Sequence, residues 1–322
     1  MRRFPLALLL ASAAAAGCGA APGAPVEQVV IPPRASLRVT AESLSAHGVI
    51  GSRRWFRLMA RVGGYDRRLQ SGTFELPRGA GARAALRALA EGRSRLNRFT
   101  VPEGYTLLDI AAAAERELGI PAESVLAAAR DTALLREFEV PAPTFEGFLR
   151  PETYLFAPGI SAATLVRAMA ETFREDWDPA WTAAAAAQGL DRLQVVTLAS
   201  LVEGEAAVDS DRELVAAVYR NRLRLGMPMQ ADPTVQYAIQ LATGARKPRL
   251  YEKDYGFESP YNTYLHAGLP PGPVGAPNRR SIEAVLHPAP VPYLYLVAGS
   301  DGRHIFSRTY AEHLRAVRRV QR

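Results

Sequence analysis

The hydrophobic and polar positions of the chain predict two units of different character. In the first, short alternating stretches that favour strands are mixed with helical patterns. Strands are expected at residues 29–31 and 72–76, and helices at residues 36–48, 52–62 and 82–91. The first unit is therefore expected to be a small α/β subdomain over residues 29–98.

Helical periodicity dominates the rest of the chain, after a short strand at residues 99–101. Helices are expected at residues 106–118, 121–136, 161–175, 179–188 and 310–320. A strand at residues 291–297 is expected to pair with residues 304–306 across a turn. The predicted fold class is α+β, in which a larger, mainly helical domain with a short β-sheet spans residues 99–322.

Composition excludes several classes of protein. The chain has 322 residues, of which 48% are hydrophobic and 22% charged, as in ordinary globular proteins and unlike disordered or polytopic membrane proteins. A single cysteine excludes a disulfide scaffold and a CxxC metal site, and the five histidines show no HExxH spacing. We therefore expect no metal and no cofactor.

The net charge of +7 comes almost entirely from arginine, because Lys247 and Lys253 are the only lysines. Basic proteins can bind nucleic acids or anionic surfaces. However, no basic stretch carries the interleaved aromatic residues of a single-strand binder. We expect no nucleic-acid partner.

The N-terminus has the layout of an export signal. Arg2 and Arg3 precede an apolar run over residues 4–16, which predicts a signal peptide at residues 1–17. Cys18 follows small residues, as in the lipobox at which bacterial lipoproteins are cleaved and acylated, and residues 18–28 are expected to form a tether. We expect a lipid anchor at Cys18. An uncleaved spanning helix stays an alternative, against which glycines and prolines after residue 16 argue.

The strongest candidate for chemistry is Glu203. It follows residues 193–202, which are apolar nearly all round and predict a buried helix. Gly204 is expected to end or weaken this helix, which places Glu203 near the negative end of the helix dipole. Burial and this dipole are expected to raise the pKa of Glu203, as general-acid cleavage of a glycosidic bond requires. The structural alternative is a salt bridge to an arginine. Glu205 is expected to point about 200° away and to orient a loop or pair with Arg212.

Six sequence blocks, taken in order, resemble a known family. They are residues 146–154 (EGFLRPETY), 198–206 (LASLVEGEA), 218–223 (VYRNRL), 229–237 (MQADPTVQY), 261–264 (YNTY) and 268–273 (GLPPGP). The chain resembles the YceG-like endolytic peptidoglycan transglycosylases, with Glu152 where that family usually has Asp. The resemblance implies that residues 29–98 form a LysM-like subdomain and residues 99–322 a transglycosylase catalytic domain.

The resemblance also implies the reaction and the partners. The family's catalytic glutamate corresponds to Glu203, which would cleave nascent glycan strands between N-acetylmuramic acid and N-acetylglucosamine and leave 1,6-anhydromuramyl ends. Such an enzyme would terminate glycan elongation during cell wall assembly. Its expected partners are peptidoglycan glycan strands and peptidoglycan synthases. With its N-terminal anchor in the membrane, the folded part is expected in the cell envelope, on the periplasmic face of the cell membrane.

Other residues of these blocks are candidate ligands of the glycan. Amide and carboxylate groups suit saccharide hydroxyls, and tyrosine rings can stack on pyranose faces. The predicted substrate-binding residues are Asn221, Gln230, Asp232, Tyr237, Tyr261 and Asn262. The sequence leaves open whether Glu146, Glu152 or Asp232 supplies a second catalytic carboxylate. Asp232 also has a structural interpretation, as a helix N-cap followed by Pro233.

Three other functions compete with this interpretation. A muramidase would let water attack the same bond. An inactive glycan-binding envelope lipoprotein would use the LysM-like unit alone. A nucleic-acid binder would rest on charge, and the export signal argues against it.

Overall fold

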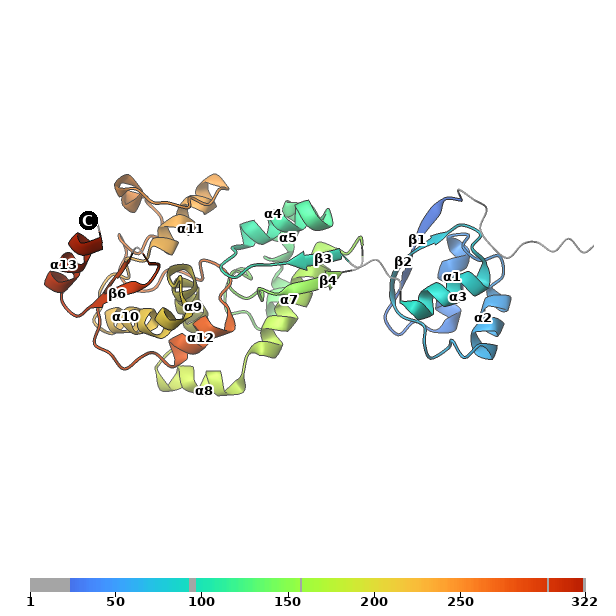
Figure 1. Ribbon diagram of the computed structural model, residues 1–322, viewed down its shortest axis with the longest axis horizontal. Helices are drawn as coiled ribbons and strands as arrows, with labels where there is room; N and C mark the ends of the chain where they lie inside the picture. Colours follow the sequence, from blue (N-terminus) through green and yellow to red (C-terminus); the bar gives the residue numbers. More distant parts are fainter. Residues whose placement is uncertain (1–23, 93–96, 157, 300, 321–322) are drawn as a thin grey trace, which may run out of the picture. The chain divides into compact units, whose positions relative to one another are not determined.

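The structure is a computed structural model that describes residues 24–92, 97–156, 158–299 and 301–320 (Figure 1). These residues divide into two compact units, of which the second begins at Asn97. Each unit has its own hydrophobic core. The expected signal peptide at residues 1–17 and Cys18 lie outside the described residues. Within the described part, no helix is long and apolar enough to cross a membrane.

The first unit has the element order β-α-α-β-α. Its elements are β1 (Val26–Ile31), α1 (Leu37–Ala46), α2 (Arg53–Val62), β2 (Gly72–Pro77) and α3 (Gly81–Glu91). The two strands pair antiparallel, with Val29 opposite Phe74, and both side chains are fully buried. The strand β1 begins at Val26, so the last three residues of the expected tether belong to it.

Local sequence explains where the first two helices begin. The side chain of Ser36 accepts a hydrogen bond from Val39 N, and that of Ser52 accepts one from Trp55 N. Each serine satisfies a backbone donor that has no partner within its helix. The predictions for these two helices are therefore confirmed to within two residues at each end.

The second unit opens with a strand pair and three helices. The strands β3 (Asn97–Thr100) and β4 (Thr153–Phe156) pair antiparallel, and the helices are α4 (Leu107–Leu118), α5 (Ala122–Ala128) and α6 (Thr132–Glu137). The single helix expected over residues 121–136 is wrong. The side chain of Asp131 accepts from Ala133 N and Leu134 N, so it begins a new helix where periodicity alone predicted a continuous one.

Helix α9 lies at the centre of the second unit. The next helices along the chain are α7 (Ala162–Asp176), α8 (Pro179–Ala187), α9 (Arg192–Glu205), α10 (Arg212–Arg224), α11 (Asp232–Thr243) and α12 (Arg279–Leu286), with short 3-10 turns η1 (Asp209–Asp211) and η2 (Glu252–Gly256). Helix α9 packs against α8, α10, α11 and α12 (Figure 1). Its residues from Val195 to Val202 are all buried, which confirms the prediction of a buried helix.

The chain ends in a hairpin and a helix. The strands β5 (Tyr295–Ala298) and β6 (His304–Ser307) pair antiparallel, and α13 (Tyr310–Val320) follows. The strand expected from residue 291 begins only at Tyr295. Pro292 has no N–H for a ladder, and the carbonyls of Val291 and Tyr293 accept instead from the side chain of Asn221. With two-stranded antiparallel sheets among many helices, the described residues confirm the α+β fold class.

Candidate active site

Glu203 lies in the last turn of α9. The helix continues through Gly204 to Glu205, so the expectation that Gly204 ends it is wrong. A Cβ atom at position 204 would lie 2.7 Å from Pro233 Cγ, too close for any side chain. Gly204 therefore allows α9 to approach the start of α11 closely, rather than terminating α9.

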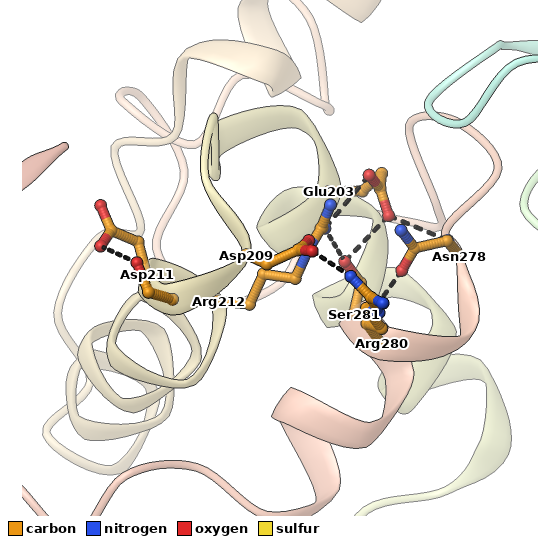
Figure 2. Close-up of polar contacts among 8 residues, drawn as sticks. Glu203, Asp209, Asp211, Arg212, Asn278, Arg280 and Ser281 are labelled. Carbon is orange, nitrogen blue, oxygen red and sulfur yellow. Dashed lines mark hydrogen bonds and ion pairs between the residues drawn. The ribbon is translucent and has the colours of Figure 1, made fainter. Parts of the chain in front are cut away.

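The carboxylate of Glu203 accepts from three groups (Figure 2). Its Oε1 lies 3.1 Å from Nη1 of Arg212. Its Oε2 accepts from the backbone N of Asn278 and from Oγ of Ser281, at 2.9 Å each. The Glu203 and Arg212 side chains are only 6% and 9% exposed. Of the two interpretations that the sequence left open for Glu203, the salt bridge to an arginine is therefore present.

The N-terminus of α12 contributes a second favourable field. The Asn278 side chain accepts from Ser281 N at 2.9 Å and so begins this helix, while the Asn278 backbone N donates to Glu203. A helix N-terminus carries a partial positive charge and stabilises an anion. This charge opposes the effect of the C-terminal end of α9, on which Glu203 lies.

Arg212 is held by two carboxylates. Its Nε donates to Oδ1 of Asp209 at 3.0 Å, and Asp209 also pairs with Arg280 (Figure 2). Burial lowers the pKa of Arg212, but Glu203 and Asp209 together raise it above its ordinary value. Asp209, Arg212 and Arg280 line a cavity of about 590 Å³, to which Glu203 itself does not contribute. The cluster therefore connects the Glu203 carboxylate with an open part of the surface.

The hydrogen-bonding capacity of Glu203 is not exhausted by these contacts. A carboxylate oxygen has two lone pairs. Among the residues that the structure describes, Oε2 accepts two hydrogen bonds, whereas Oε1 has one contact, the ion pair with Arg212. Oε1 therefore retains one position for a proton or for a sugar hydroxyl. Gly104 also faces this side chain, since a Cβ there would lie 3.9 Å from Glu203 Cγ.

Glu205 faces another part of the unit, as its spacing from Glu203 predicted. Burial and the nearby Asp232 raise the pKa of Glu205 to about 8, while a hydrogen bond from Tyr219 lowers it. The expected pairing of Glu205 with Arg212 is wrong, because Arg212 binds Glu203.

Asp232 lies at the start of α11 beside this group. Its Oδ1 accepts from the Tyr264 hydroxyl at 2.6 Å. Ala231 is the N-cap residue and Asp232 the first residue of the helix, so the reading of Asp232 as an N-cap is wrong.

Glu146 forms a second buried acidic centre. Its carboxylate accepts from Leu107 N at 3.1 Å and from the Tyr237 hydroxyl at 3.0 Å. Burial raises the pKa of Glu146 to about 8 despite these hydrogen bonds. Glu146, Tyr237 and Tyr261 line a cavity of about 230 Å³, in which the two rings meet edge to face at 4.8 Å.

One backbone segment connects the two acidic centres. Gly104 lies against Glu203, and Leu107, three residues further on, donates to Glu146. Three residues span at most about 11 Å. The Glu146 cavity and the Glu203 cluster are therefore neighbours along residues 104–107.

The two predicted asparagine ligands hold the backbone. Asn221 donates to the carbonyls of Val291 and Tyr293 at 2.9 and 3.0 Å. Asn262 is 0% exposed, donates to two carbonyls of the preceding loop and accepts from Tyr264 N at 2.9 Å. A direct contact of either asparagine with a ligand stays a prediction that this geometry does not favour.

Gln230 and Glu152 are exposed. The Gln230 side chain accepts from Arg222 Nη1 at 3.2 Å, and its backbone has a positive φ of 50°. Glu152 accepts from its neighbour Thr153 N and contacts none of the residues around Glu203. Of the three candidates for a second carboxylate, Glu152 is the exposed one, whereas Glu146 is buried.

The sequence did not point to the residues that hold Glu203. Arg212, Asn278 and Ser281 come from two other helices, and Ser281 is 78 residues away along the chain. Asn278, a polar residue before an apolar run, indicates the start of a helix. This pattern does not indicate that the helix contacts Glu203. In the described residues no group of three or more histidine, cysteine or acidic side chains could hold a metal ion.

Comparison with known proteins identifies the family. The YceG-like family model matches residues 29–319, so the chain belongs to the YceG-like family. It is 32% identical over 309 residues to a protein of Bacillus subtilis (strain 168) named endolytic murein transglycosylase, covering 89% of this chain and 82% of the relative. A Streptococcus pneumoniae serotype 2 protein of the same name is 27% identical over 317 residues, and the match spans only 57% of that longer relative.

A solved structure agrees with this assignment. The crystal structure of a YceG-like protein from Listeria monocytogenes aligns with a TM-score of 0.63 and 28% sequence identity, covering 91% of this chain and 99% of that one. Both units of the present chain therefore fall within the region shared with its relatives.

Proposed function

We propose that the protein is a lytic transglycosylase that cleaves peptidoglycan glycan strands from within, between N-acetylmuramic acid and N-acetylglucosamine. Support comes from the named relatives and from one observation in particular. Glu203, in the sequence block shared with the family, is held by Arg212, Ser281 and the N-terminus of α12 and keeps an acceptor position on Oε1.

In this proposal Glu203 acts twice. It first protonates the glycosidic oxygen that leaves, and becomes a carboxylate. The negative charge that then develops is met by Arg212, Ser281 Oγ and Asn278 N, which are already in place. The carboxylate next takes the proton from the muramyl C6 hydroxyl as its oxygen attacks C1. The products are a 1,6-anhydromuramyl end and a free N-acetylglucosamine end.

This route needs no second carboxylate. A hydrolase would need one about 5 to 9.5 Å away to act as nucleophile or to activate water. The described contacts of Glu203 are with donors, and the carboxylate nearest in the network, Asp209, is bound to Arg212 and Arg280. Internal attack by the C6 hydroxyl is therefore proposed because it needs no carboxylate other than Glu203.

The glycan is proposed to extend from Glu203 toward the Glu146 cavity. Tyr261 and Tyr237 line that cavity and offer ring faces or edges to a sugar. Asp232, with the Tyr264 hydroxyl, and the exposed Gln230 are proposed as outer contacts.

The cellular setting is part of the proposal. Residues 1–17 direct export, a lipid on Cys18 anchors the protein to the cell membrane, and the folded part acts in the envelope on strands delivered by peptidoglycan synthases, ending their elongation. Blocking lipoprotein processing is expected to leave a precursor that still carries residues 1–17 and migrates more slowly on a denaturing gel. Unchanged mobility would favour an uncleaved spanning helix.

The products test the reaction directly. Purified glycan strands are digested with the wild-type protein, and the fragments are analysed by mass spectrometry. The proposal predicts anhydromuramyl ends, which are about 18 Da lighter than the hydrolysed ends because no water is added. Reducing muramyl ends alone would establish a muramidase instead.

A second candidate function rests on the ion pair itself. A buried pair of Glu203 and Arg212 is also what a purely structural bridge looks like, and the protein would then be an inactive glycan-binding envelope protein. Absence of any new chain ends after prolonged digestion, together with retention of the strands on the protein, would establish this alternative.

A further inference from the structure

The first unit exposes an apolar stripe along α2. Trp55, Leu58 and Val62 are 56%, 52% and 82% exposed, and their spacing places them on one face of the helix. The opposite face carries Phe56 and Ala60, which are fully buried in the core of this unit. The stripe is therefore not needed for the packing of the unit.

A groove continues the stripe toward α3. It has a volume of about 410 Å³, and its lining residues are Trp55, Leu58, Met59, Val62, Gly63, Tyr65, Arg83, Leu86 and Arg87. The Tyr65 hydroxyl is the only side-chain hydrogen-bond acceptor among them, apart from the weak thioether of Met59. A saccharide needs several acceptors for its hydroxyls, so this lining does not suit a sugar.

Arginines surround the stripe. Helix α2 itself carries Arg53, Arg54, Arg57 and Arg61, of which three are exposed and Arg57 is partly exposed. Among the residues the structure describes, none of these four arginines forms an ion pair. Arginine presents donors only and matches phosphate groups well.

The charge of the chain is concentrated in this unit. Residues 24–92 contain eleven arginines and five acidic residues, whereas residues 97–322 contain 24 basic and 27 acidic residues. The first unit is thus strongly basic, and the unit that carries Glu203 is slightly acidic. Such an asymmetry indicates that the anionic partner belongs to the first unit.

We propose that the α2–α3 face of the first unit binds the surface of an anionic phospholipid bilayer. Trp55, Leu58 and Val62 enter the boundary between headgroups and acyl chains, and the surrounding arginines pair with lipid phosphates. A helix with apolar and aromatic residues on one side and arginines beside them has the chemistry of an interfacial helix. The bilayer offers phosphate acceptors to the four arginines of α2, for which the described residues show no ion pair.

The reach of the chain agrees with this arrangement. Cys18, the anchor residue of the proposed function, precedes Val26 by eight residues, which span at most about 28 Å. A lipid at Cys18 would keep the first unit within that distance of the membrane. This argument alone rests on the proposed anchor, whereas the charge and the apolar stripe do not.

Vesicle binding tests the proposal without the anchor. A chain that begins at Gly19 keeps every described element and lacks both the signal and Cys18. It is mixed with vesicles of phosphatidylcholine alone or with 30% phosphatidylglycerol, and the bound fraction is measured by sedimentation. We expect binding to the anionic vesicles, at least tenfold weaker binding to the neutral ones, and a blue shift of Trp55 emission that is absent in Trp55→Phe.

Two variants separate the apolar and the charged contributions. The charge variant is Arg54→Ser/Arg57→Ser/Arg61→Ser, which is expected to weaken binding on the order of 100-fold, since each arginine near the surface contributes about fivefold. The apolar variant is Trp55→Ser/Leu58→Ser/Val62→Ser, which removes the side chains that enter the bilayer and is expected to weaken binding on the order of 100-fold as well. Val26→Thr/Val30→Thr changes two other exposed apolar residues of the same unit and is the matched control, with binding unchanged. Circular dichroism checks that all three variants are folded.

Three results would overturn the proposal. The first is equal binding of wild type to neutral and anionic vesicles, and the second is anionic binding that neither triple variant reduces. The third is that the wild type binds no vesicles but binds purified glycan strands, and that the triple serine variant of Trp55, Leu58 and Val62 no longer binds these strands. This result would make the groove a saccharide site. Glu203→Gln should bind vesicles as the wild type does, so failure of the proposed reaction would leave this result untouched.

Discussion

Glu203 and Arg212 form an ion pair of 3.1 Å with both side chains almost fully buried. The pair joins the end of α9 to the start of α10, and Ser281 of α12 contacts both partners. Three helices therefore meet at the carboxylate to which the proposed reaction is assigned. Its position is fixed by charge and hydrogen bonds rather than by a dry apolar surrounding.

Removing the arginine tests the stabilising role of this pair. Arg212→Met leaves Glu203 without its cation, and breaking a buried pair in this way costs about 3–5 kcal/mol. Denaturant unfolding should show a loss of that size. Arg280→Met is the matched control, since Arg280 is largely exposed and pairs with the same Asp209, and we expect it to cost no more than about 1 kcal/mol.

A double variant checks that the loss comes from the pair. In Glu203→Gln/Arg212→Met no buried carboxylate is left without a partner, so this variant should be more stable than the sum of the single changes predicts, by about 0.5–3 kcal/mol. Strict additivity would show that the two side chains do not depend on each other.

Stability should fall between about pH 5 and pH 8 because of Glu146. Burial raises the pKa of Glu146 from 4.5 to about 8, so in this range the folded protein holds a proton that the unfolded chain releases. The stabilising contribution is complete below pH 4.5 and is lost as pH rises toward 8, with a slope of at most about 1.4 kcal/mol per pH unit. Glu205 acts in the same direction.

Glu146→Gln isolates the contribution of this group. The variant cannot ionise, so its unfolding free energy should depend less on pH between 5 and 8 than that of the wild type, measured by urea unfolding at several pH values. Identical slopes in both proteins would mean that Glu146 ionises normally in the folded state.

Asn262 is predicted to stabilise the loop before it rather than to bind substrate. Its amide makes three hydrogen bonds to backbone groups in a fully buried position. Asn262→Ala leaves these groups without partners, and a loss of roughly 2–4 kcal/mol in unfolding free energy is expected. Gln230→Ala, at an exposed position of the same site region, should cost less than about 1 kcal/mol. A stable Asn262→Ala protein with a raised KM would instead support direct binding.

The sequence predicted those parts of the fold that local patterns determine. Residues 193–202 are apolar nearly all round and predicted the buried helix α9. The helices expected from residues 36 and 52 begin at serines that cap α1 and α2. The predicted helix and strand boundaries were wrong where a side chain forms hydrogen bonds with the backbone. Asp131 divides a predicted helix, and the Asn221 amide takes the carbonyls of residues 291 and 293 out of a predicted strand.

The candidate site was predicted only in part for a similar reason. A motif and a buried helix were sufficient to single out Glu203, because both are properties of one stretch of chain. Its surroundings depend on contacts between helices far apart in sequence, such as that between Glu203 and Ser281. Neither hydrophobic periodicity nor spacing carries that information, so a salt bridge of Glu203 remained one alternative with its arginine unidentified, and Arg212 was assigned to Glu205.

The assignment of the chemistry to Glu203 is tested most directly by comparing two glutamine variants on the same glycan strands. Glu203→Gln keeps the size of the side chain but can neither give nor take the proton, and we expect the rate at which anhydromuramyl ends appear to fall by about 10²- to 10⁴-fold. Glu205→Gln, two residues away on another side of α9, should retain most of the activity. Release of anhydromuramyl ends by Glu203→Gln at the rate of the wild type would contradict the account.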